Sequence, residues 1–208
     1  MKNSASFIGC LIGLLLGSLS TPVLATDNLD RTWDPQQYGI YNYSPCMTYE
    51  SDFPSSSPTG NPRSRVSEGR NKWNLVGREL YFRTATGCEK WIHANWNDNL
   101  VPFNDDWAFV SNDQWGAISN SDVNFNASPD KPGGGSYPWY WGSATTTPSG
   151  YIDGISVAAH EFGHSVALGH TGQCTCDVMY NFIDLGKNRR SLTSHDRASI
   201  SALYAAAN

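Results

Sequence analysis

The stretch HEFGHSVALGH, from His160 to His170, places three histidines and one glutamate at fixed spacing. In an α-helix successive side chains are about 100° apart, so His160 and His164 stand roughly 40° apart on one face. Both imidazoles can therefore bind one metal ion at about 2.0–2.1 Å. His170 would point away on a continuing helix, so we expect a break before it, and Gly169 stands where a break costs little. Three neutral nitrogen ligands leave a fourth position open for water, as a catalytic zinc site requires.

Glu161 lies about 100° round the helix from His160, beside the ion rather than in line with both imidazoles. A carboxylate there suits a general base that takes a proton from a metal-activated water. The alternative is a buried helix that carries histidines by chance, because HExxH alone is not specific. The third histidine in register, and Met179 nine residues after it, favour the zinc interpretation.

HEFGHSVALGH resembles the metzincin zinc signature HExxHxxGxxH, and the wording HEFGH is typical of matrixins. The resemblance implies a secreted zinc-dependent endopeptidase with these metal ligands and this catalytic residue: His160, His164, His170 and Glu161. One position differs, because Ala167 stands where the family has a glycine. A left-handed alanine would cost on the order of 1–2 kcal/mol. We therefore expect either that Gly169 takes over part of the turn or that Ala167 keeps a negative φ.

The segment CDVMYNF, Cys176 to Phe182, resembles the matrixin Met-turn, in which a methionine forms an apolar floor under the three histidines. Met179 maps onto that methionine and would support the site without touching the metal. A core methionine with no such role is the alternative. Asn181 replaces the proline that often follows in the family, so the pocket wall is not predicted and no substrate-binding residue is assigned.

Apolar periodicity and turn residues predict the remaining elements. Strands are expected at Cys46–Tyr49, Glu79–Thr84, Lys90–Asn95, Trp107–Val110 and Val123–Asn126. Helices are expected at Ser64–Leu75 with Ser64 as its cap, at Ile155–Leu168 after an Asp153 cap, and after a Thr193–Asp196 capping box. Ser128 to Gly150 should be a long loop, and its PWYW cluster is interpreted as a fold anchor rather than a substrate rim.

This order of elements is similar to a matrixin catalytic domain. The resemblance implies an α+β, zincin-like fold: a mixed, mostly parallel twisted sheet packed on the active-site helix, with a C-terminal helix after an irregular Met-turn segment. Gly116 to Asn126 looks like the family's edge strand. By resemblance, Val123 to Asn126 would pair with an extended substrate, and replacing Phe125 should raise KM.

Residues 1–25 resemble a secretory signal peptide, with Lys2 before an apolar run and Val23-Leu24-Ala25 before the cut. Residues 26–208 are then expected to form one catalytic domain, monomeric and secreted to an extracellular or periplasmic location. The net charge of −5, without a cluster of Lys or Arg, argues against nucleic acid as a partner. No later segment is apolar enough for a membrane span, so the expected partner is a protein or peptide substrate.

Four cysteines remain after the signal, consistent with two disulfides in an oxidising compartment: Cys46, Cys88, Cys174 and Cys176. Cys46–Cys88 with Cys174–Cys176, and the crossed pairings, are equally open. His93 could bind a second zinc, but its usual partners are not evident, and His195 is expected to be solvated. Calcium binding is left open without assigned ligands, because acidic side chains occur in loop-like sequence: Asp105, Asp106, Asp113, Asp122 and Asp130.

Two other function classes fit the same residues. An adhesion or glycan-binding module with a non-catalytic zinc would use the many Trp and Tyr residues, but it would have no use for Glu161. A hydrolase of a non-protein bond could use the same metal. No cysteine segment of the kind that keeps animal matrixins latent is visible, so an external inhibitor or immediate activity on export is expected.

Overall fold

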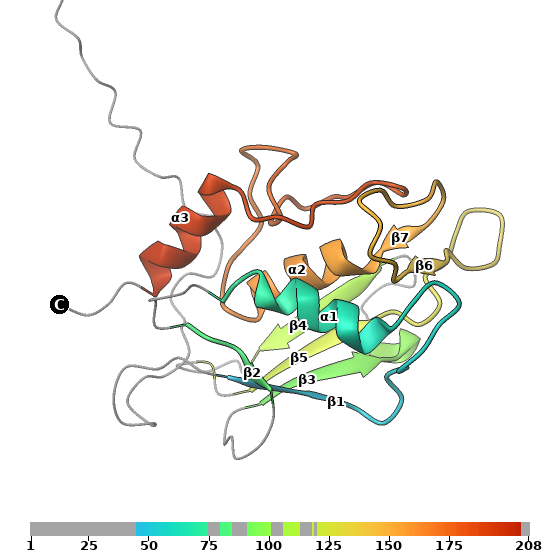
Figure 1. Cartoon of the computed structure of the whole chain (residues 1–208), viewed down its shortest axis with the longest axis horizontal. Helices are drawn as coiled ribbons and strands as arrows, with labels where there is room; N and C mark the ends of the chain where they lie inside the picture. The colour runs from blue at the N-terminus through green and yellow to red at the C-terminus, as the bar shows by residue number, and fades with distance from the viewer. Residues whose placement is uncertain are drawn as a thin grey trace, which may run out of the picture.

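The computed structural model describes residues 45–74, 80–84, 91–100, 106–112, 118 and 120–204. The expected signal peptide lies outside these ranges. Figure 1 shows the elements in chain order. They are β1 (Cys46–Tyr49), α1 (Pro62–Asn71), β2 (Arg83–Thr84), β3 (Trp91–Trp96), η2 (Asp98–Leu100), β4 (Ala108–Asn112), β5 (Asn120–Phe125), β6 (Trp139–Tyr140), β7 (Ile152–Asp153), α2 (Gly154–His164) and α3 (Ser194–Leu203).

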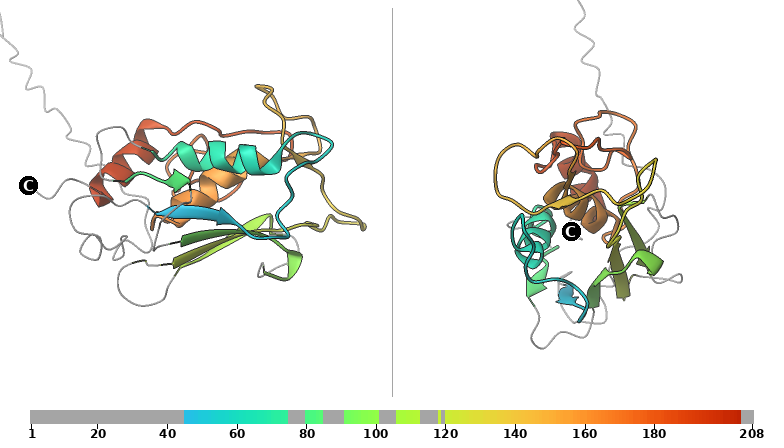
Figure 2. Two further views of the ribbon diagram at one scale, coloured as in Figure 1. Left: turned by 60° about the horizontal axis from the view of Figure 1, so that its bottom comes forward. Right: turned by 90° about the vertical axis from the view of Figure 1, so that its right-hand side faces the viewer.

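The main sheet has the strand order β2-β1-β3-β5-β4. β1, β2, β3 and β5 pair in parallel, while β4 runs antiparallel to β5. Helices α1 and α2 lie side by side over one face of this sheet, and α3 lies at one end of the molecule (Figures 1 and 2). The predicted α+β architecture, with a mixed and mostly parallel sheet packed on the active-site helix, is confirmed.

The expectation that residues 116–126 form the edge strand is wrong. β5 lies between β3 and β4, and β4 forms the edge of the sheet. The alternation in β5 marks its two faces correctly, since Val123 and Phe125 are fully buried. Periodicity, however, does not encode which strand lies beside which. Phe125 packs edge-on against Phe53 with ring centroids 5.5 Å apart, so its replacement would damage the core rather than a substrate contact.

Helix α1 begins earlier than predicted. Asn61 is its N-cap, with its side chain accepting from the Ser64 N–H, and Pro62 occupies the first turn. The assignment of Ser64 as cap was therefore wrong. Gly69, which counts against a helix by propensity, is where α1 meets α2. A Cβ at Gly69 would lie 2.7 Å from the Cβ of Ala158, so the missing side chain permits the close approach of the two helices.

The PWYW cluster belongs to the core, as interpreted. Trp141 is 1% exposed and Trp139 is 8% exposed, and their rings stack at 5.2 Å. Trp139 donates its indole N–H to the carbonyl of Asn126 at 3.0 Å. The two tryptophans therefore anchor the long loop to the core, and the loop contains the short strand β6, which the sequence did not predict.

The structure pairs Cys174 with Cys176, with Cα atoms 5.0 Å apart. This pairing rules out the crossed connectivities. Cys46 also takes part in a disulfide, while Cys88, its expected partner, lies outside the described residues.

Candidate metal centre

The active-site helix α2 begins at a buried carboxylate. Asp153, at the end of β7, is the N-cap, and its Oδ1 accepts from the N–H of Ser156 at 2.9 Å and from the Ser156 hydroxyl at 2.7 Å. Ile155, Ala158 and Phe162 of the helix are fully buried, as is Val166 just after it.

Helix α2 ends at His164 and not at Leu168 as predicted. Two bonds close its C-terminus: the Leu168 N–H donates to the carbonyl of Gly163 at 3.0 Å, and the Ala167 N–H donates to that of His164 at 2.9 Å. This pair of bonds is a Schellman motif, whose C′ residue must be left-handed. Ala167 takes that conformation with φ of 68°, and Gly169 does not have a positive φ. Both expectations for this turn were therefore wrong.

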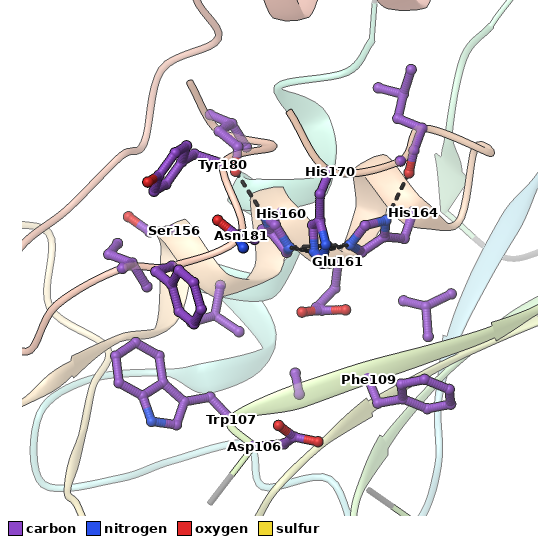
Figure 3. A pocket seen from close by; sticks show the side chains of 18 of the residues that line it. Asp106, Trp107, Phe109, Ser156, His160, Glu161, His164, His170, Tyr180 and Asn181 are labelled. Carbon is purple, nitrogen blue, oxygen red and sulfur yellow. Dashed lines mark hydrogen bonds between the residues drawn. The ribbon is translucent and has the colours of Figure 1, made fainter. Parts of the chain in front are cut away.

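The early end of the helix brings the third histidine back toward the first two. The Nε2 atoms of His160 and His164 are 3.1 Å apart (Figure 3). The Nε2 atom of His170 lies 3.2 Å from that of His160 and 3.1 Å from that of His164. Ligands at 2.0–2.1 Å in a tetrahedral zinc site would be about 3.3–3.4 Å apart. The three nitrogens thus fit one zinc ion with little movement, and His160, His164 and His170 could bind a metal.

Backbone carbonyls fix the rings of two of these histidines. His160 Nδ1 lies 2.7 Å from the carbonyl oxygen of Val178, and His164 Nδ1 lies 2.7 Å from that of Leu168. A carbonyl can only accept, so each Nδ1 carries the proton and each Nε2 presents its lone pair. Burial and the neighbouring His164 hold the pKa of His160 well below its usual value, and burial and His170 lower the pKa of His164 to about 4. Both imidazoles are therefore neutral near pH 7.

Glu161 lies beside the three histidines and points from α2 into the cleft (Figure 3). Its side chain is largely buried, with the residue 7% exposed. Burial, with a smaller effect of the Asp106 carboxylate, raises the pKa of Glu161 to about 8 in the metal-free chain. A nearby dication favours the ionised carboxylate. The side chain is thus placed to exchange a proton near neutral pH once a cation is beside it.

Met179 is fully buried beneath α2. A Cβ at Gly163 would lie 2.2 Å from the Met179 sulfur, so the glycine of HEFGH makes room for this methionine. The N–H groups of Val178 and Met179 donate to the carboxylate of Asp196, at 3.0 Å and 3.3 Å. Asp196 also accepts from the N–H of Thr193 at 2.9 Å in the predicted capping box. Sequence reasoning found the cap but missed that the same carboxylate holds the Met-turn.

A cleft of about 840 Å³ opens over the histidines. One wall is the edge strand β4, with Phe109 and the preceding Trp107, and the other is the segment after Met179, with Tyr180 and Asn181 (Figure 3). Phe182 also lines the cleft. Phe109 and Phe182 are 40% and 72% exposed. The cleft therefore runs beside β4 and is bordered by aromatic side chains.

Of the other predicted candidates, Asp106 lines this cleft, whereas His93 and His195 do not. His93 Nδ1 contacts Glu50 Oε1 at 2.7 Å, so His93 is paired with a carboxylate. His195 lies 3.1 Å from Asp177 Oδ2 and is not a solvated residue. Within the described ranges, the groups of three close ligand atoms are the three histidines and the trio Cys174, Cys176 and Asp177, whose two sulfurs are joined. Calcium binding stays a prediction.

The convergent histidines and the adjacent carboxylate in the cleft are the arrangement expected of a zinc metallopeptidase. The family model for matrixin matches residues 63–205, and the chain belongs to the matrixin family. The match extends the resemblance well upstream of Gly116, where the sequence motifs alone gave only a loose likeness. A search among curated proteins gave no significant match.

Proposed function

We propose that this zinc metalloendopeptidase is secreted, binds its catalytic zinc through His160, His164 and His170, and uses Glu161 as general base. The observation that carries the proposal is the convergence of three Nε2 atoms within 3.1–3.2 Å of one another. Their Nδ1 bonds to carbonyls support the ligand role, because they leave the lone pairs facing a common centre. Met179 would form the apolar floor under the three histidines.

The chemistry divides between the ion and the chain. When bound, Zn²⁺ would lower the pKa of a water molecule and polarise the scissile carbonyl. Glu161 accepts the proton of the attacking water and returns it to the leaving amine. The Glu161 side chain lines the cleft and is largely buried, which limits its contact with bulk water. The neutral state of His160 and His164 means that metal binding near pH 7 need not displace protons from these rings.

The substrate is expected to lie along β4 and not along residues 123–126. The outer edge of β4 has no neighbouring strand in the described sheet, whereas both edges of β5 are occupied. An extended peptide can add to such an edge through main-chain hydrogen bonds. The cleft follows Ala108, Phe109 and Val110 of this strand, so the bound peptide would pass directly over Glu161.

Secretion is supported by the signal-like residues 1–25, with residues 26–208 as the single mature domain. Among the helices of the described chain, none combines the length and apolar character needed to cross a bilayer. The disulfide between Cys174 and Cys176 fits an oxidising compartment. N-terminal sequencing of the exported protein should begin at Thr26.

The decisive experiment compares the mature wild type with Glu161→Ala on an unfolded protein substrate, at matched zinc content. Cleavage by the wild type alone would support Glu161 as the base. Equal cleavage by both proteins would reject that role. If neither cleaves while both hold one zinc ion, peptide hydrolysis by this site is rejected and the binding-module interpretation takes its place.

A further inference from the structure

One wall of the cleft is a segment without helix or strand. We call residues 180–190 the substrate wall. Asn181, Phe182 and Ile183 in this segment line the cleft, and Phe182 is mostly exposed. Segments that lack a backbone ladder are held by contacts with their surroundings, and they open at lower free energy than core elements. The placement of these three side chains therefore depends on how the ends of the wall are fastened.

The far end of the substrate wall is fastened to the start of α2. The Arg189 N–H donates to Ser156 Oγ at 2.7 Å. The guanidinium of Arg190 donates from Nε to Asp153 Oδ1 at 3.0 Å, and its Nη2 donates to the other oxygen. Arg189 also reaches back to the near end, where its Nη1 donates to the carbonyl of Tyr180 at 3.1 Å. Both ends of the wall are thus tied through two adjacent arginines.

Arg190 joins a third segment to the same point. Its Nη1 donates to the carbonyl of Ala144 at 2.6 Å, and the Thr147 hydroxyl donates to Asp153. The side chain of Asp153 is fully buried, and that of Arg190 is 13% exposed. The loop before β7, the first turn of α2 and the end of the substrate wall therefore meet at one buried ion pair.

A buried ion pair of this kind is expected to add little to the net stability of the fold, so stability alone does not explain its presence. Desolvating two charges offsets most of their attraction, and apolar residues of similar size are often as stabilising. A guanidinium on a carboxylate differs in that its planar fork fixes direction as well as distance. Asp153 stands seven residues before His160, about 10.5 Å along the helix. The ion pair consequently relates the substrate wall to the metal-binding histidines through one rigid element.

We propose that Arg190 is a positioning residue for substrate recognition. Through its fork on Asp153 it sets the distance between the substrate wall and α2, and so determines which substrate side chain beside the scissile bond fits between them. Ser156 and Val157 of α2 line the same cleft. This inference rests on the proposed peptidase function, because it assigns the cleft to a bound peptide. Arg190 itself contacts neither substrate nor metal.

Two conservative substitutions test the fork without removing the fold. Asp153→Asn keeps an N-cap of equal quality but removes the charge. Arg190→Lys keeps the charge but removes the planar fork. Arg197→Lys is the matched control, because Arg197 is exposed on α3 and lies outside the substrate wall. Zinc content and the midpoint of thermal unfolding are measured for every variant, so that a loss of fold is recognised.

The readouts are binding and turnover across a graded series. Peptide hydroxamates with a methyl, isobutyl or phenylethyl side chain beside the metal-binding group report the shape of the cleft without catalysis, and matched peptide substrates give KM and kcat. The wild type should distinguish members of the series by about tenfold or more. In Asp153→Asn and Arg190→Lys the ratio of affinities between the best and the worst hydroxamate should fall to about twofold. For the matched peptides, KM should change more than kcat.

The outcomes separate this inference from the proposed function. Wild-type discrimination that persists in both variants, or that is absent from the wild type, would overturn the positioning role. The positioning role is also overturned if selectivity falls only in proportion to the fraction of protein that is no longer folded. If the wild type discriminates among hydroxamates but cleaves no peptide, peptidase activity is rejected, while loss of discrimination in the two variants still supports the role of Arg190.

Discussion

At the scale of single residues, Ala167 is the one non-glycine residue with a positive φ in the described part of the chain. A non-glycine residue in the left-handed region costs on the order of 1–2 kcal/mol. Ala167→Gly should therefore raise the free energy of unfolding by about 1 kcal/mol, despite the larger entropy of the unfolded glycine chain. Urea unfolding of the metal-free proteins measures the change.

The control for this prediction is Ala198→Gly in α3, where the backbone is helical. There the same substitution should lower stability by about 0.5–1 kcal/mol. Equal destabilisation at both positions would show that the turn after α2 is not left-handed in solution.

The proximity of His160 and His164 could be predicted because helical geometry alone places them together. The conformation of Ala167 could not be predicted, because the conformational preference of alanine and the hydrogen bonds at the helix end favour different conformations. Preference disfavours a left-handed alanine, but that conformation satisfies the last carbonyls of α2, those of Gly163 and His164. Unsatisfied buried carbonyls would cost more than the strained φ.

At the scale of elements, Asp196 couples helix α3 to the Met-turn. The three backbone N–H donors are divided between the two carboxylate oxygens of Asp196. Asp196→Asn keeps one acceptor oxygen and turns an NH₂ group toward at least one of these donors. We expect a loss of about 2 kcal/mol or more in unfolding free energy, because a buried donor is left without an acceptor. Since Val178 also orients His160, zinc affinity should fall by about tenfold. Competition with a fluorescent chelator measures it.

Thr193→Ala separates the helix cap from the Met-turn contact. It removes the cap hydroxyl but keeps the bonds from Asp196 to Val178 and Met179. Stability should fall by about 1–2 kcal/mol, while zinc affinity stays as in the wild type. Equal loss of zinc affinity in both variants would argue against a path from Asp196 through the Met-turn to His160.

Most helices and strands could be predicted from local sequence patterns, but which elements lie side by side in the fold could not. Apolar alternation and caps marked the strands and the starts of α2 and α3 to within a few residues. The order of β5 and β4 depends on contacts between distant segments, such as Phe125 on Phe53, which no local period reports. The role of Gly69 was not predictable for the same reason, because it depends on the close approach of α2.

At the scale of the whole molecule, the metal site connects segments that are distant in sequence. The histidines come from α2 and the turn after it, and the Met-turn below them is held by α3. Zinc bound only by the folded chain should stabilise it by about 2.7 kcal/mol when free zinc is 100 times its dissociation constant. Chelation should therefore lower the thermal midpoint, and His164→Ala should abolish this zinc dependence. A zinc-dependent midpoint in His164→Ala would contradict the assigned ligands.

The pH dependence of folding gives a separate test of the ion pair at the start of α2. Burial alone would raise the pKa of Asp153, but hydrogen bonds from Arg190, Thr147 and Ser156 outweigh it and lower the pKa below its usual value. A carboxylate with a depressed folded-state pKa adds stability above its unfolded pKa, near 4, and loses it as pH falls through the folded value.

The wild type should therefore be more stable than Asp153→Asn above about pH 5, and this difference should shrink as pH falls below about 4. The lowered pKa values of His160 and His164 also weaken the fold on acidification, starting near pH 6.5. That loss is common to both proteins and cancels in the difference. Urea midpoints of the metal-free proteins between pH 3 and 7 measure it. A difference that stays constant over this range would mean that Arg190 does not stabilise the charged form of Asp153.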